Sequence, residues 1–140
     1  MQTLDTLLNL AIRHYRAGEL GAAEQKFRQV LKLQPNHILA LNILGIICLG
    51  SDRCDESIRL IQTALEIKPK DHQALANLAL AKQRVGDLQA AIRALERSLS
   101  LVPKNVNALN SLGSLYRDTG NIARAEQCYQ SALNLDPKHI

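Results

Sequence analysis

The sequence contains no tryptophan, one phenylalanine and three tyrosines among 140 residues. Proteins that bind single-stranded nucleic acids use such aromatic side chains to stack against the bases. The net charge of +4 is also modest, and its residues are too scattered to form a basic stripe. We therefore expect no nucleic-acid partner, and a core built mainly of leucine, isoleucine and alanine.

Cysteine and histidine are scarce as well. The three cysteines are odd in number and lack paired spacing, which favours reduced thiols in a cytoplasmic compartment over a disulfide framework. None of the four histidines stands at a recognisable metal-ligand spacing from a cysteine or carboxylate, and no glycine-rich phosphate loop occurs. The sequence predicts no catalytic residue, metal site or cofactor, and hence a chain that is not an enzyme.

Long apolar stretches are missing too. The most apolar run, ILALNILGIICLG, falls short of the roughly 20 residues that a membrane-spanning helix needs. Near the N-terminus, Asp5 interrupts the apolar residues, and Arg13 and Arg16 follow too soon for a signal peptide. We expect neither membrane insertion nor a targeting segment.

Proline occurs only at positions 35, 69, 103 and 137, so each interval (69 − 35, 103 − 69 and 137 − 103) is 34 residues. A fixed period between about 20 and 50 residues indicates a stacked repeat array. Leucine keeps the same period in three registers: Leu7, Leu41, Leu75 and Leu109; Leu10, Leu44, Leu78 and Leu112; Leu31, Leu65, Leu99 and Leu133.

The final period shows what each repeat forms. Apolar residues recur at helical spacing on both sides of Gly120, where a helix end commonly needs a left-handed residue. Gly113 and Ala125 are small where two helices would approach closely, and Pro137 would end the second helix. Each repeat is therefore predicted to be a helical hairpin.

Local signals also place helix boundaries. In the first period we expect helices at about 3–16 and 20–33, with Gly18 in the turn. Thr3 is placed to cap the first helix, and Asp71 and Asn105 occupy equivalent positions.

This pattern resembles the tetratricopeptide repeat family, most fully at Leu112, Gly113, Tyr116, Gly120, Ala125, Tyr129, Ala132 and Pro137. The resemblance implies an all-α, right-handed α-solenoid, a superhelix of about eight helices. The whole chain, 1–140, would be one array with repeats at about 3–36, 37–70, 71–104 and 105–138. Asp52 replaces the turn glycine of the second repeat, so we expect that turn to be the loosest joint.

The resemblance further implies a concave groove lined by the first helix of each repeat. The predicted peptide contacts are Leu8, Asn9, Ile12, Leu39, Asn42, Ile43, Ile46, Asn77, Leu80, Arg84, Asn107, Asn110 and Arg117. The same register places Leu49, Gln73, Ala76, Gln83 and Ser111 in the groove. Asparagine carboxamides can donate to and accept from an extended peptide backbone. Alternatively, these asparagines are ordinary solvated surface.

The groove chemistry favours some ligands over others. Certain family members bind C-terminal carboxylates through lysine, arginine and asparagine, but Leu8, Ile43 and Gln73 stand at such positions here. An apolar or amphipathic peptide, extended or helical, fits this surface better. We therefore predict a non-catalytic protein–protein interaction scaffold that binds a peptide or helix in its groove.

A second interpretation stays open, in which the chain is the recognition arm of a larger enzyme. Asn9 and Asn77 match asparagines in the repeat arrays of O-linked N-acetylglucosamine transferases, whereas Ile43 and Ser111 do not.

Terminal helices of solenoids need a polar outer face, yet Leu115, Ile122 and Leu135 are predicted to be exposed after the last repeat. We favour a fragment of a longer protein, whose copies could also self-associate through this C-terminal face.

Overall fold

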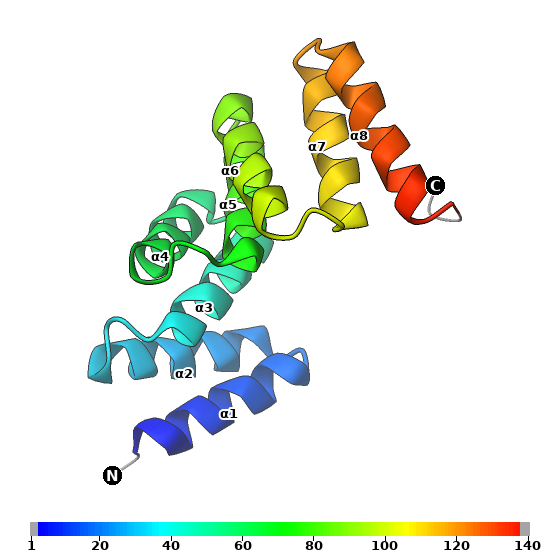
Figure 1. Cartoon of the computed structure of the whole chain (residues 1–140). Coiled ribbons are helices and arrows are strands. Elements are labelled where there is room, and N and C mark those ends of the chain that lie inside the picture. The colour runs from blue at the N-terminus through cyan, green and yellow to red at the C-terminus, as the bar shows by residue number, and fades with distance from the viewer. Residues whose placement is uncertain (1–2, 138–140) are drawn as a thin grey trace. The chain divides into compact units, whose positions relative to one another are not determined.

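The computed structural model describes residues 3–137 and contains eight α-helices and no strand within that range (Figure 1). The helices are α1 (Leu4–Arg16), α2 (Leu20–Leu33), α3 (Ile38–Gly50), α4 (Cys54–Ile67), α5 (His72–Arg84), α6 (Leu88–Leu101), α7 (Val106–Asp118) and α8 (Ile122–Leu135). The predicted all-α class is confirmed, and so are the helices expected at 3–16 and 20–33.

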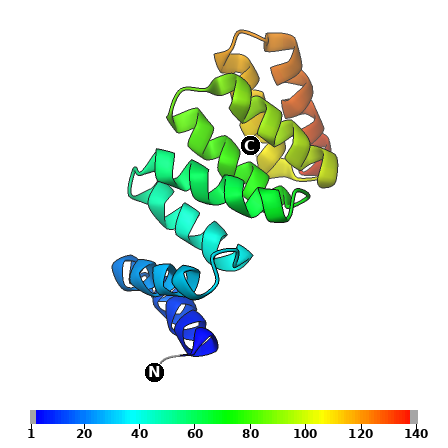
Figure 2. The same ribbon diagram turned by 90° about the vertical axis from the view of Figure 1, so that its left-hand side faces the viewer.

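The helices pair in chain order as hairpins, α1 with α2, α3 with α4, α5 with α6 and α7 with α8 (Figures 1 and 2). They form two compact units of two hairpins each. Unit 1 ends at Pro69 and unit 2 begins at Lys70. The repeat boundary predicted at Lys138 lies outside the described residues, and the single continuous array stays a prediction.

Side-chain caps start the first helix of every hairpin. The Thr3 hydroxyl accepts a hydrogen bond from a backbone N–H at 3.2 Å, and Asp71 and Asn105 do the same at 3.2 and 3.1 Å. These three predicted caps are confirmed. In the second hairpin His37 Nδ1 accepts from the Ala40 N–H at 3.2 Å, a cap that the sequence reasoning missed because histidine is an uncommon capping residue.

Each unit has its own apolar core. Phe27 and Leu44 are fully buried in unit 1, and Leu95 and Leu115 are buried in unit 2. The predicted exposure of Leu115 is therefore wrong: its side chain faces the core of unit 2 and is 0% exposed. Ile122 and Leu135 are 52% and 41% exposed, as predicted.

Small residues allow the two helices of a hairpin to approach closely. A Cβ atom on Gly113 would lie 2.8 Å from Tyr129 Cε1, so the predicted role of Gly113 is confirmed. In the second hairpin a Cβ atom on Gly45 would lie 2.8 Å from Ile61 Cγ1. The Ser57 hydroxyl donates to the Gly45 carbonyl oxygen at 2.7 Å, which joins the helices at the same point.

The turn inside each hairpin contains one residue with left-handed backbone. Gly18, Gly86 and Gly120 have φ values of 80°, 87° and 85°, and Asp52 takes the same conformation with φ 64°. A side chain at positive φ is sterically disfavoured, although aspartate tolerates it better than most residues. The second turn thus keeps the shared geometry with a residue poorly suited to it.

Replacing Asp52 with glycine should raise the free energy of unfolding by about 0.5–1 kcal/mol, because relief of the positive-φ strain exceeds the extra unfolded-state entropy of glycine. Urea denaturation followed by circular dichroism measures the change. Asp52→Ala is the matched control and should be destabilising, since it removes the side chain but keeps the Cβ atom. A glycine variant no more stable than the alanine variant would contradict this account.

Candidate functional site

Unit 2 contains a cavity of about 410 Å³ between α5 and α7, here named the α5–α7 cavity. Its lining residues are His72, Gln73, Ala76, Asn77, Ala79, Leu80, Gln83, Leu95, Asn105, Asn107, Ala108 and Ser111. None of them is an aspartate, glutamate, lysine or arginine. Its polar lining therefore consists mainly of carboxamide and hydroxyl groups, which lie beside apolar surface.

Helix geometry explains how α5 contributes its polar groups. Gln73 and Asn77 are four residues apart, so they lie on the same side of α5. On α7, Asn107 and Ser111 have the same four-residue spacing. The capping residues Asp71 and Asn105 fix where both helices begin, and hence which side chains face the cavity.

The floor of the cavity is made by small residues. Ala79 and Ala108 are 2% and 5% exposed, and Ala76 packs against the core of unit 2. Larger side chains at these positions would fill the space. Leu80 is 41% exposed and adds accessible apolar surface. A ligand side chain could thus enter between the polar groups and contact an apolar floor.

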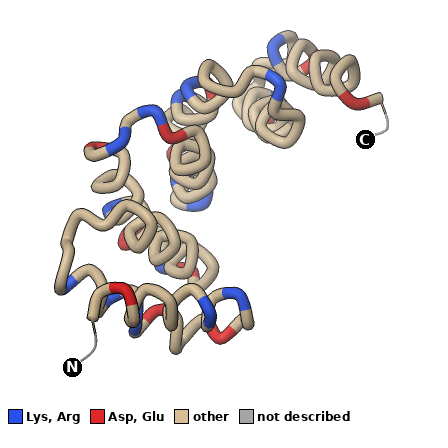
Figure 3. The backbone as a smooth tube through the Cα atoms, turned by 60° about the horizontal axis from the view of Figure 1, so that its bottom comes forward, with Lys and Arg blue, Asp and Glu red and all other residues tan. Residues whose placement is uncertain are grey.

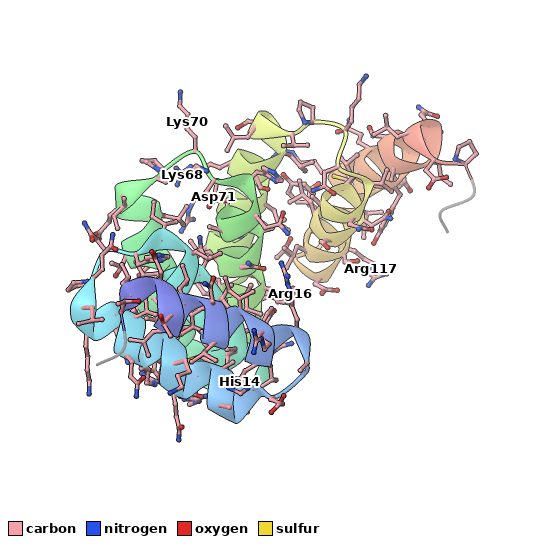
Figure 4. All side chains as sticks on the ribbon, turned by 90° about the horizontal axis from the view of Figure 1, so that it is seen from below. His14, Arg16, Lys68, Lys70, Asp71 and Arg117 are labelled. Carbon is pink, nitrogen blue, oxygen red and sulfur yellow. The ribbon has the colours of Figure 1, made fainter. Side chains whose placement is uncertain are left out.

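The predicted contacts in unit 2 are only partly brought together. Asn77, Leu80 and Asn107 line the cavity, whereas Arg84, Asn110 and Arg117 are not among its lining residues. Arg117 lies at the end of α7, where its side chain extends away from the helix (Figure 4). Its Nε is 3.7 Å from the Asp118 carboxylate of the same turn. Ligand binding by all six residues stays a prediction.

Sequence reasoning did not identify every lining residue. His72, Ala79, Leu95, Asn105 and Ala108 were missed. Asn105 had been recognised only as a cap. Leu95 comes from α6, outside the first helices on which the predicted groove was based. Its apolar character alone gives no sign of its place beside a cavity.

The predicted contacts in unit 1 have a different environment. Leu8, Ile12 and Ile43 are half-buried and pack against the core of unit 1. Asn42 and Ile46 are also half-buried, while Asn9 and Leu39 are exposed. Their contact with a ligand stays a prediction.

The placement of Leu49 in the groove is wrong. Its side chain is only 4% exposed. It lies in the last turn of α3, a helix that is apolar on nearly all sides, so that helical periodicity alone could not tell which sides are covered.

A charged cluster links the two hairpins of unit 1. Glu24 on α2 accepts hydrogen bonds from Arg28 at 2.8 Å and from Arg53 at 2.6 Å. Arg28 also reaches Glu56 on α4 at 2.9 Å. This cluster could not be predicted from the sequence, because Glu24 and Arg53 are separated by 29 residues. We name these four residues the ion cluster.

The ion cluster changes the acid–base behaviour of its members. Hydrogen bonds from Arg53, and then from Arg28, lower the pKa of Glu24 to about 2, against the opposing effect of burial. Next to the cluster, burial raises the pKa of the Cys48 thiol to about 11, and the nearby Glu56 carboxylate adds to this effect. Cys48 is therefore a protonated thiol at neutral pH.

Unit 2 places a different polar group at the corresponding position. Tyr116 lies two periods after Cys48 (116 − 48 = 68). The Tyr116 hydroxyl donates to a Glu96 carboxylate oxygen at 2.7 Å, and Arg124 stacks 5.7 Å from the ring centroid. Both units therefore join neighbouring hairpins by polar contacts around this position of the repeat.

Glu24→Gln should lower the free energy of unfolding at pH 7 by about 1–2 kcal/mol. This range allows for solvent screening, because the arginine partners are 38% and 40% exposed. A carboxyl with a depressed pKa stabilises the fold above its unfolded-state value of 4.5 and loses that contribution as pH falls toward 2.

Urea denaturation at several pH values measures this contribution. The stability difference between the wild type and Glu24→Gln should shrink over the interval from 4.5 to 2. Glu66→Gln removes an exposed carboxylate of the same unit and serves as the control. A difference that does not depend on pH would contradict the assigned role of the Glu24 charge.

The remaining charges are dispersed. Basic and acidic positions are scattered over both units (Figure 3). Within residues 3–137, no group of three or more histidine, cysteine or acidic residues could hold a metal ion. In the same part of the chain, no helix is long and apolar enough to cross a bilayer.

The helical hairpins, with their shared cap, small-residue contact and left-handed turn residue, define a repeat protein of the α-solenoid class. Residues 8–72 and 71–138 each match a sequence model of the tetratricopeptide repeat. The chain belongs to the tetratricopeptide repeat family, as its sequence pattern predicted. Membership of this family supports a role as a protein-interaction scaffold.

Individual relatives agree with this assignment. A peroxisomal targeting signal receptor from Kluyveromyces lactis is 34% identical over 79 residues, which are 56% of this chain and 14% of that protein. A solved structure of MamA is 25% identical, with a TM-score of 0.92 over 97% of this chain and 80% of that one. MamA from Desulfovibrio magneticus RS-1 is 22% identical, with a TM-score of 0.92 over 98% and 77% of the two chains.

Proposed function

We propose that the chain is a non-catalytic scaffold that binds a peptide segment of a partner protein in the α5–α7 cavity. The observation that carries the proposal is the set of uncharged polar side chains around an alanine floor, chiefly Gln73, Asn77 and Asn107. Carboxamides can pair with both the N–H and the C=O groups of an extended backbone. The apolar floor would receive one side chain of the ligand.

The absence of aspartate, glutamate, lysine and arginine from the lining argues for an uncharged ligand segment. A lysine or carboxylate of the ligand would lose hydration in the cavity without gaining a charged partner. Leu80 is exposed at the edge of the cavity, and its apolar surface favours an aliphatic or aromatic ligand side chain. The preferred segment is therefore neutral, with one large apolar residue.

The relative named as a peroxisomal targeting signal receptor suggests a specific probe. The tripeptide Ser-Lys-Leu at a C-terminus is a peroxisomal address. Its lysine and terminal carboxylate fit poorly with the uncharged lining of the α5–α7 cavity. We expect a neutral internal peptide to bind more tightly than one ending in Ser-Lys-Leu.

Selection of a random peptide display library on the purified protein tests the proposal. Enriched peptides should be neutral around one large apolar residue. Asn77→Leu should weaken their binding by about tenfold, because two hydrogen bonds of about 0.5–1.5 kcal/mol each would be lost. Fluorescence anisotropy of a labelled peptide measures the affinity.

A matched control separates cavity contacts from general effects of adding leucine. Gln127→Leu introduces the same side chain at an exposed position of α8, away from the cavity, and should leave affinity unchanged. The proposal fails if both variants weaken binding equally. It also fails if the Ser-Lys-Leu peptide binds best and its amidated form does not bind, since a carboxylate would then be the recognised group.

A further inference from the structure

Unit 1 contains a cavity of about 270 Å³ that shares no residue with the proposed peptide site. Arg28, Leu31 and Lys32 of α2 line it together with Leu44 of α3 and Leu60 of α4. We name it the α2–α4 cavity. None of these residues belongs to the predicted groove. Arg28 is a member of the ion cluster and Leu44 of the buried core, whereas Leu31, Lys32 and Leu60 belong to neither.

The apolar part of this cavity is a leucine floor. Leu44 is fully buried and is one of the lining residues. Leu31 and Leu60 pack against the core of unit 1 but stay half-buried, so part of each remains open to water. Covering such apolar surface is favourable by about 25 cal/mol per Å². The space between α2 and α4 suits a ridge of side chains from a third helix.

The charged part of the cavity lies along α2. Arg28 is held by Glu24 at 2.8 Å and by Glu56 at 2.9 Å, so its charge is already balanced. Lys32 is four residues further on, on the same face of α2, and is exposed. Since the four charges of the ion cluster sum to zero, Lys32 supplies the net positive charge beside the leucine floor.

We propose that the α2–α4 cavity docks an acidic amphipathic helix of a partner protein, which inserts a leucine-sized side chain between α2 and α4 and places a carboxylate near Lys32. The apolar floor supplies the affinity. The lysine selects for acidic over basic helices, because charge complementarity chiefly determines specificity and association rate. Arg28, fixed by its two carboxylate partners, forms a rigid edge to the cavity.

A display library of helical peptides with one randomised face tests this proposal. Selection on the wild-type protein, with counter-selection on Lys32→Glu, should enrich helices that combine leucine or isoleucine with glutamate or aspartate. For such a peptide, Lys32→Glu should weaken binding by about tenfold at low salt. Exchanging the acidic residues of the peptide for lysine should restore its binding to the Lys32→Glu variant.

The chain offers a matched control on the same helix. Lys26→Glu makes the same charge change outside the cavity and should change affinity less than twofold. Asn77→Leu in unit 2 should leave binding unchanged, which separates this proposal from the peptide site. Equal losses in Lys26→Glu and Lys32→Glu, or enriched helices without an acidic excess, would overturn it.

Discussion

Phe27→Ala should lower the free energy of unfolding by about 3–5 kcal/mol, the largest effect expected of any single truncation in unit 1. Phe27 is 0% exposed on α2 and lies in the core with Leu7, Val30 and Leu44. Removing the ring loses its transfer free energy and leaves a cavity that these neighbours cannot fill. Such a loss is a large part of a typical domain stability of about 5–15 kcal/mol.

Urea denaturation monitored by circular dichroism gives the change directly. Leu33→Ala is the control, because Leu33 is on the same helix but 59% exposed, and it should shift stability by no more than about 0.5 kcal/mol. Similar losses in both variants would show that Phe27 does not have the central packing role assigned to it.

Gly45→Val should be the second most damaging change, with a loss of about 2–3 kcal/mol from overpacking. A Cβ atom at this position would lie 2.8 Å from Ile61 Cγ1. Ile61 is 0% exposed and therefore has little room to move. The two helices of the second hairpin would have to separate, which would also strain the hydrogen bond from Ser57 to the Gly45 carbonyl.

The same helix provides the control for Gly45→Val. Gly50 is also in α3, but a Cβ atom there would meet no atom within 4 Å apart from its chain neighbours and the adjoining helix backbone, so Gly50→Val reports the cost of valine without crowding. The double variant Gly45→Val with Ile61→Ala should lose less stability than the sum of the losses in the two single variants, since the shorter side chain makes room for valine. Strict additivity in this double-mutant cycle would contradict the proposed contact.

Helix boundaries could be predicted from the sequence because local chemistry sets them. Thr3, Asp71 and Asn105 cap helices by bonding to a backbone N–H three residues away. Gly120 adopts the left-handed turn that its place in the period requires. These interactions involve neighbours in the chain, and the fourfold repeat allowed equivalent positions to be compared and each interaction to be predicted.

Contacts between distant residues could not be predicted in the same way. Glu56 stands three residues before Arg59, a spacing at which helical ion pairs form, yet its carboxylate reaches Arg28 and Arg53. Leu49 and Leu115 are buried although their positions in the repeat suggested exposure. Which apolar side of a helix is covered depends on the neighbouring helices, and that information is not local.

The candidate site could likewise be predicted only in part. Asn77, Leu80 and Asn107 could be placed on one side of their helices by register, and they do line the α5–α7 cavity. Leu95 could not be foreseen as a lining residue, because it comes from α6, outside the first helices on which the predicted groove was based. The volume of a cavity depends on where small side chains leave space as much as on which large side chains surround it.

The ion cluster limits how this chain could be taken apart and recombined. Glu24 and Arg28 belong to the first repeat, and Arg53 and Glu56 to the second. A chimaera cut at Pro35 would keep two of these charges and replace the other two with those of a foreign repeat. The partners left behind would be partly buried ions without their counter-charges. The first two hairpins should therefore be transplanted together, as one cassette of two repeats.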